Sequence, residues 1–153
     1  RAKEADKMEA ARKAGELTEY MGINLKNTKI GSFVYANKPG DGSAREQAAS
    51  CQKVLSGWAN IAVEYDTKRY RSNLVNWGMI PFVIDNADMV DFKDEDCILI
   101  SSIKSALESG ADIMSAKVLS TGTELNLKMP DMSQSERDIL TEGCLINYYK
   151  NNK

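Results

Sequence analysis

The sequence has 153 residues, with 20 Lys and Arg against 22 Asp and Glu, a formal net charge of -2 and no histidine. This length fits one domain with its own hydrophobic core, and the near-neutral charge excludes a general electrostatic attraction to nucleic acids or anionic membranes. The absence of histidine excludes Ser-His and Cys-His catalytic pairs and histidine-ligated metal sites.

The three cysteines, Cys51, Cys97 and Cys144, are odd in number and far apart. This usage excludes a disulfide framework and a CxxC motif, and it favours a reducing, cytoplasmic setting. The sequence contains no apolar run of about 18 residues, and its charged N-terminus is not typical of a signal peptide. Because the sequence does not begin with Met, we expect a piece of a longer protein.

The N-terminal part predicts a helix followed by a strand. Residues 1–21 are rich in Ala, Glu and Lys, so we expect a helical lead-in over residues 1–27 and the core of a single domain over residues 28–153. The β-branched and aromatic residues between Gly31 and Ala36 predict a strand.

A glycine turn then leads into a helix. The segment Pro39-Gly40-Asp41-Gly42 ends the strand, and from Ser43 the apolar residues recur at helical spacing. Ser43 and Glu46 match the S-x-x-E pattern of a capping box, in which the serine caps the helix. A helix is therefore predicted to begin at Ser43.

A second strand and helix follow. The apolar run of residues 60–65 predicts a buried strand, and Tyr70, Asn73, Leu74 and Trp77 share one face of the next helix. Gly78 and Pro81 are predicted to end that helix. The aromatic residues of this region are predicted to pack between sheet and helix: Trp58, Tyr65, Tyr70 and Trp77.

The second half of the chain is predicted to be rich in strands. We expect strands at residues 80–84 and 97–101, then a hairpin over residues 112–129 with Gly122 in its turn. A last helix, capped by Ser133 and Glu136, is predicted to direct three residues inward: Ile139, Leu140 and Ile146. The alternation of strand and helix at the centre predicts an α/β fold class.

The loop between the first strand and its helix has the composition of an anion site. A helix N-terminus presents free N–H groups, and Gly40 and Gly42 allow positive φ and close approach of a ligand. Arg45 can bind a carboxylate with two N–H groups, and Ser43 would lie beside that anion, where surrounding donors could stabilise a developing alkoxide. The alternative is a plain turn followed by an N-cap. The loop matches neither a Rossmann fingerprint nor a P-loop.

A second basic group begins the next predicted helix. Lys68, Arg69 and Arg71 repel the positive end of the helix dipole, which favours a ligand or partner carboxylate nearby. Alternatively, these arginines are solvated or paired with Glu64 and Asp66. Asn73 is a candidate ligand contact, although a core hydrogen bond explains it equally well.

Two stretches together resemble a known family. "GDGSAREQAA" followed by "NIAVEYDTKRYRSNLVNWGMIPF" resembles the C-terminal swivelling domain of the aconitase family in order and spacing, and "SQSERDILTEGCLINYYK" resembles its terminal helix. The resemblance runs from about Thr28 to the end of the chain. It implies a swivelling β/β/α domain, here truncated at its N-terminus.

The resemblance also implies roles for individual residues. Ser43 matches the family's catalytic base, and Arg45 matches an arginine that binds a substrate carboxylate. Gly42 and Ala44 would line the substrate, but Ala44 replaces the family's second serine and so removes one hydroxyl contact. A second motif, matched by Arg71, Ser72 and Asn73, would support the loop.

The implied protein is the C-terminal part of an aconitate hydratase, interconverting citrate and isocitrate through cis-aconitate in the tricarboxylic acid cycle. The implied iron-sulfur (4Fe-4S) cluster would be held by other domains of the same protein. We expect no metal in this chain, no activity of the chain alone, and no membrane or nucleic-acid partner. The alternatives are a separate small subunit of an isopropylmalate-isomerase-like dehydratase, or a non-catalytic carboxylate- or RNA-binding module.

Overall fold

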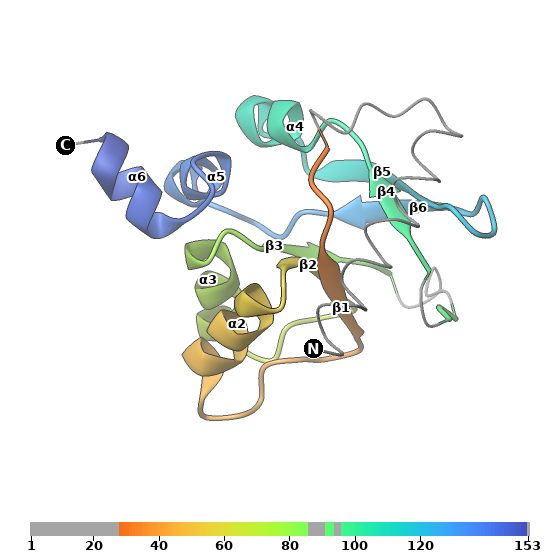
Figure 1. Ribbon diagram of the computed structural model, residues 1–153, viewed down its shortest axis with the longest axis horizontal. Helices are drawn as coiled ribbons and strands as arrows, with labels where there is room; N and C mark the ends of the chain where they lie inside the picture. Colours follow the sequence, from red (N-terminus) through yellow and green to blue (C-terminus); the bar gives the residue numbers. More distant parts are fainter. Residues whose placement is uncertain (1–27, 86–90, 94–95, 153) are drawn as a thin grey trace, which may run out of the picture.

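A computed structural model describes residues 28–85, 91–93 and 96–152. The predicted lead-in helix lies outside these ranges. The strands are β1 (Ser32–Ala36), β2 (Gly57–Ala62), β3 (Ile80–Val83), β4 (Ile98–Ile100), β5 (Ile113–Val118) and β6 (Glu124–Lys128). The helices are α2 (Arg45–Val54), α3 (Lys68–Asn76), α4 (Ile103–Ser109), α5 (Gln134–Thr141) and α6 (Leu145–Asn151). The predicted α/β class is confirmed (Figure 1).

The first half of the described chain is a parallel β-α-β-α-β unit. β1 pairs with β2, and β2 pairs with β3, both in parallel, while α2 and α3 form the connections between them. Ala36 lies opposite Ala62, and Ala62 lies opposite Val83, so the three strands end at one edge. The loops that leave β1 and β2 therefore start side by side.

The second half is antiparallel and joins the first through one residue pair. The predicted hairpin is confirmed: β5 and β6 pair around a turn in which Gly122 has φ +74°, and β4 adds to the other edge of β5. The strand order is β1-β2-β3-β6-β5-β4. Between β3 and β6, the pairing seen among the described residues is that of Val83 and Lys128.

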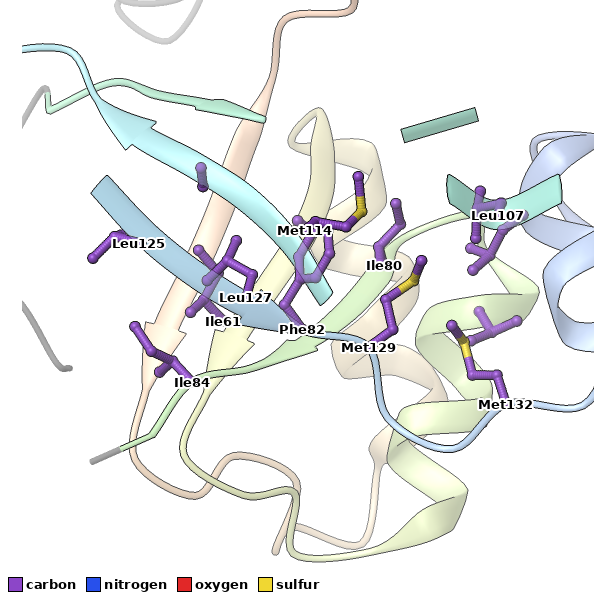
Figure 2. Packing of buried hydrophobic residues seen from close by; sticks show 14 of the residues in the cluster. Ile61, Ile80, Phe82, Ile84, Leu107, Met114, Leu125, Leu127, Met129 and Met132 are labelled. Atoms are coloured by element: carbon purple, nitrogen blue, oxygen red, sulfur yellow. The ribbon is translucent and has the colours of Figure 1, made fainter. Parts of the chain in front are cut away.

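One apolar cluster connects the two halves. It collects side chains of β2 and β3 together with the inward-facing, alternate residues of β5 and β6 (Figure 2). Ile61, Phe82 and Leu127 are each at most 1% exposed. Because both halves contribute to this cluster, the antiparallel half packs over the parallel half, and burial of these side chains is the main contribution to stability.

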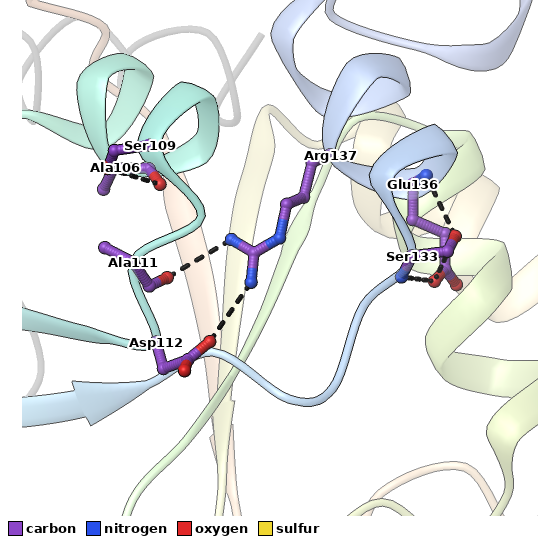
Figure 3. A network of polar contacts seen from close by, with 7 residues as sticks. All are labelled: Ala106, Ser109, Ala111, Asp112, Ser133, Glu136 and Arg137. Atoms are coloured by element: carbon purple, nitrogen blue, oxygen red, sulfur yellow. Dashed lines mark hydrogen bonds and ion pairs between the residues drawn. The ribbon is translucent and has the colours of Figure 1, made fainter.

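Helix α5 ties the hairpin to the helical layer. Ser133 and Glu136 form the predicted capping box at its start, which is confirmed (Figure 3). Further along the helix, the buried Arg137 donates to the carbonyl oxygen of Ala111 at 3.2 Å and to the Asp112 carboxylate at 3.3 Å. A buried guanidinium needs such acceptors, and here they fix α5 against the start of β5.

Some predictions about the elements are wrong in detail. The second strand covers Gly57–Ala62 rather than residues 60–65, because the chain turns directly from α2 into β2 through Ser56, which has φ +66°. Helix α4 was not predicted. The last helix is two helices, because Gly143 has φ +93° and interrupts the helical path, and Ile146 is 73% exposed instead of pointing inward.

The predicted packing of the aromatic residues is confirmed for Tyr70 and for Tyr65 and Trp77, which are partly buried against the same small cluster. Tyr70 is buried, and the pKa of Tyr65 is raised mainly by burial. Trp58 is half-buried, and the ammonium groups of Lys29 and Lys53 lie over its ring, 4.5 and 3.8 Å from the ring centre. Burial lowers the pKa of Lys53, and the nearby Lys29 lowers it further. The cation–π contacts with Trp58 partly offset the cost of holding these two ammonium groups close together.

Candidate active site

The loops that follow β1 and β2 are joined at the carboxyl edge of the parallel strands. The amide of Glu64 donates to the carbonyl of Asn37 at 3.0 Å, and the amide of Asp66 donates to the carbonyl of Pro39 at 3.1 Å. This edge is where open α/β sheets place their ligands. The structure therefore brings the glycine loop, residues 37–44, next to the segment that leads into the second motif.

Lys38 neutralises the carboxylates of this edge. Its ammonium lies 2.9 Å from the Glu64 carboxylate and 4.0 Å from that of Asp66, and the hydrogen bond with Glu64 raises the pKa of Lys38. Among the described residues, Arg69 and Arg71 pair with neither carboxylate. The alternative that those arginines are paired with Glu64 and Asp66 is therefore wrong.

Ser43 does not cap helix α2, which corrects the prediction. The cap residue is Ala44, no side chain caps the helix, and the carboxylate of Glu46 instead accepts a hydrogen bond from the Trp77 indole at 3.1 Å. Helix α2 starts one residue later than the capping box requires, so Glu46 occupies the wrong position for it. Ser43 is exposed, and its hydroxyl bonds to none of the residues that the structure describes.

Arg45 folds back onto the glycine loop. Its Nε donates to the carbonyl oxygen of Gly40 at 3.1 Å, and the residue is half-buried. No described residue accepts a hydrogen bond from its terminal NH₂ groups. The forked end of the guanidinium is therefore available to a ligand, and it is the part that binds a carboxylate with two hydrogen bonds.

The two glycines of the loop differ. Gly40 has φ +103°, and a Cβ atom there would lie between 2.5 and 2.8 Å from atoms of the Tyr70 side chain. Gly42 does not adopt the positive φ that glycine allows, and a Cβ there would have no neighbour within 4 Å. Gly40 is thus needed for the fold of the loop, and Gly42 faces open space.

We expect Gly40→Ala and Gly42→Ala to separate these two roles. Gly40→Ala should lower the free energy of unfolding by about 2 kcal/mol, because positive φ strains alanine and its methyl group meets the Tyr70 ring. Gly42→Ala should change it by less than about 0.5 kcal/mol. Urea denaturation monitored by circular dichroism measures both values. Equal losses would show that the Tyr70 ring does not constrain Gly40.

A buried polar network beneath the loop was missed in the sequence. Asn60, which is fully buried, accepts from the Gln52 amide at 2.6 Å and donates to the Tyr70 hydroxyl at 3.1 Å. The Tyr65 hydroxyl reaches the carbonyl oxygens of Asn60 and Phe82 at 3.2 and 3.0 Å. The available signal was an asparagine inside an apolar strand, since a buried amide requires partners.

The residues of the second motif lie on α3, which packs against α2. Arg71, Ser72 and Asn73 are half-buried, and the Nε atom of Arg71 is buried without a hydrogen-bond partner. Helix α3 is capped by Thr67, whose hydroxyl accepts from the Tyr70 amide at 3.2 Å. The contact of the second motif's helix with the glycine loop is thus made by Tyr70, the residue just before the motif.

The described side chains that could bind a metal ion are not grouped into a site. In the ranges 28–85, 91–93 and 96–152, no three His, Cys, Asp or Glu residues are grouped so that they could hold a metal ion. The cysteines form no disulfide among the described residues: Cys51 is exposed on α2, while Cys97 and Cys144 precede β4 and α6. These residues do not fit an iron-sulfur cluster. None of the described helices is long and apolar enough to span a bilayer.

Comparison with known proteins identifies relatives of the chain. No protein-family model matches it. It is 33% identical over 129 residues to the methanogen homoaconitase small subunit of Methanocaldococcus jannaschii. The aligned region covers 84% of this chain and 67% of that protein.

A solved structure agrees with that relative. The 3-isopropylmalate dehydratase (leuD) of the same organism has a TM-score of 0.61 and 26% identity, and covers 83% of this chain and 68% of that one. Each comparison covers more than four fifths of this chain. The chain belongs to the family of homoaconitase and isopropylmalate dehydratase small subunits, within the aconitase superfamily.

Proposed function

We propose that the chain is the small subunit of a hydro-lyase acting on a 2-hydroxy di- or tricarboxylic acid, in which Ser43 is the base and Arg45 binds a substrate carboxylate. The observation that carries the proposal is the exposed Ser43 hydroxyl, which follows the carboxyl end of β1 and is not consumed by helix capping. A serine needed only for the fold would cap the helix.

The geometry of the loop supports a division of roles. Arg45 uses Nε to hold Gly40, and its terminal NH₂ groups bind the carboxylate. Next to it, the first-turn amides of α2 and the positive end of the helix dipole stabilise negative charge. As the alkoxide that these donors stabilise, Ser43 takes the proton from the carbon adjacent to that carboxylate and becomes a hydroxyl. The C–H electron pair becomes the new C=C bond, and hydroxide leaves from the neighbouring carbon.

The described donor groups do not fit a cluster, so we assign activation of the leaving hydroxyl to a partner subunit. The relative of known identity is named a small subunit, which supports a separate subunit over a domain fused to the rest of an aconitate hydratase. Ala44, exposed beside Ser43, leaves room for a substrate substituent where a serine hydroxyl would otherwise lie.

The test uses the protein assembled with the cluster-bearing subunit of its own source and reconstituted anaerobically. Hydration is followed by loss of absorbance of the unsaturated acids cis-aconitate, cis-homoaconitate and isopropylmaleate. We expect the wild type to turn over at least one of them. Arg45→Lys should raise KM about 10- to 100-fold, because one ammonium replaces a two-pronged contact.

Lys53→Arg is the matched control, since it keeps a cation on the same helix away from the loop. Turnover of cis-aconitate and of neither other acid would show that the enzyme has the substrate of an aconitate hydratase. A wild-type complex that is inert on all three acids would overturn the proposed function.

A further inference from the structure

The Tyr70 ring is the floor of the glycine loop. Tyr70 is 5% exposed, in the first turn of α3, and its ring atoms occupy the space that a Cβ on Gly40 would need. Gly40 in turn offers its carbonyl oxygen to Arg45 Nε at 3.1 Å. A shift of the ring therefore moves Gly40, and with it the acceptor that orients the Arg45 guanidinium.

Two contacts restrain the ring. Its hydroxyl accepts from the Asn60 amide at 3.1 Å, and Asn60 accepts from Gln52, so the hydroxyl is connected through β2 to α2. The Tyr65 ring lies beside it with centroids 6.3 Å apart, and the Tyr65 hydroxyl is tied to two strand carbonyls. A side chain with these constraints has one orientation, which a loop above it can use as a reference.

Burial raises the pKa of Tyr70, although its bond with Asn60 opposes that shift. The hydroxyl therefore remains protonated around neutral pH, and the bond from Asn60 is kept. Tyr70 lies below the loop and, through Gly40, reaches Arg45 without needing contact with substrate.

We propose that Tyr70 is a positioning residue for the Ser43–Arg45 loop: its ring fixes the Gly40 turn, and the Gly40 carbonyl fixes the Arg45 guanidinium. This inference rests on the proposed function for its effect on catalysis. Its structural part, the restraint of residues 40–45, is independent of any reaction.

The test compares three variants of the full chain. Tyr70→Leu removes the ring, Tyr70→Phe keeps the ring and removes the hydroxyl, and Leu74→Ala weakens the same buried cluster one turn further along α3. Leu74 is fully buried, and the three atoms nearest to a Cβ on Gly40 all belong to Tyr70. It therefore controls for a general loss of packing.

Hydrogen-deuterium exchange of the loop amides is the first measurement. We expect Tyr70→Leu to speed exchange at residues 41–45 by about tenfold or more relative to the β2 amides. Tyr70→Phe and Leu74→Ala should leave that ratio unchanged, even where they lower the overall denaturation midpoint. Faster loop exchange in Leu74→Ala equal to that in Tyr70→Leu would overturn the proposal.

Steady-state kinetics of the assembled enzyme is the second measurement. Tyr70→Leu should lower kcat about 10- to 100-fold and raise KM, because a displaced guanidinium binds the carboxylate in the wrong place. Tyr70→Phe should recover kcat to within about threefold of the wild type, and Leu74→Ala should match it. A Tyr70→Phe variant as impaired as Tyr70→Leu contradicts the role of the ring. If the wild type itself is inert, the proposed function fails, and the exchange ratios still decide whether Tyr70 positions the loop.

Discussion

Replacing Ser43 with alanine is expected to lower kcat of the assembled enzyme by about 10²- to 10⁴-fold, the usual contribution of a proton-transfer group. KM should change little, because Arg45 and the amides of α2 still bind the carboxylate. The free energy of unfolding should stay within about 0.5 kcal/mol of the wild type, since the exposed hydroxyl bonds to none of the described residues. Initial rates of hydration and urea denaturation measure the two quantities.

Ser50→Ala is the matched control for this substitution. Ser50 lies on the same helix, and its hydroxyl donates only to the Gln47 carbonyl at 3.2 Å, so its removal should leave kcat unchanged. Loss of stability in Ser43→Ala comparable to loss of a helix cap would instead identify Ser43 as a structural residue. Wild-type kcat in Ser43→Ala would remove it from the reaction.

Gly78→Ala is expected to cause the largest loss of stability, at least about 3 kcal/mol. Gly78 ends α3 with φ +71°, and a Cβ there would collide with the carbonyl oxygen of Gly143, a backbone atom that cannot rotate away. The left-handed strain accounts for about 1 kcal/mol, and the remainder comes from forcing apart α3 and the turn between α5 and α6. Urea denaturation of the full chain measures the loss.

Gly110→Ala separates strain from collision. Gly110 has nearly the same φ, +72°, but a Cβ there would have no neighbour within 4 Å, so we expect a loss of only about 1 kcal/mol. Equal losses at the two positions would show that the contact between Gly78 and Gly143 does not constrain the packing of the helices.

The same four-residue pattern shows how far the sequence predicts local structure. Ser133 and Glu136 form a capping box, as their spacing indicates, whereas Ser43 and Glu46 do not. Helix α2 starts one residue too late for its capping box, and the Glu46 carboxylate instead binds the Trp77 indole, 31 positions away. Spacing reports which local bond is available, and a tertiary contact decides whether it forms.

The strand and helix order of the parallel half was predictable because the period of the apolar residues changes at each boundary. The buried face of the last helix was not predictable. Gly143, in the left-handed conformation, divides that helix into two, and the second helix exposes Ile146. Helix α4 had a readable signal in Gly110, which caps its end in the left-handed conformation, but a helix this short shows little periodicity.

The candidate site was predictable in its motif and not in its support. The loop composition identified Ser43 and Arg45, since glycines and a helix start are local features. The contact between Tyr70 and Gly40, and the bonds from Gln52 and Asn60, connect three elements and follow only from how the helices pack on the sheet. Periodicity alone assigns Tyr70 to the core, where its ring is indeed buried.

The single residue pair between β3 and β6 determines what sets the orientation of the two halves of the sheet. Main-chain bonds fix the geometry within each half, but between the halves the described part of the ladder contains one pair, Val83 and Lys128. The angle between them is therefore a property of side-chain volume, set by residues such as Phe82 and Leu127. A variant of this chain could change that angle by one substitution that enlarges a side chain on one half and another that shrinks its neighbour on the other half. Neither substitution would remove a main-chain hydrogen bond.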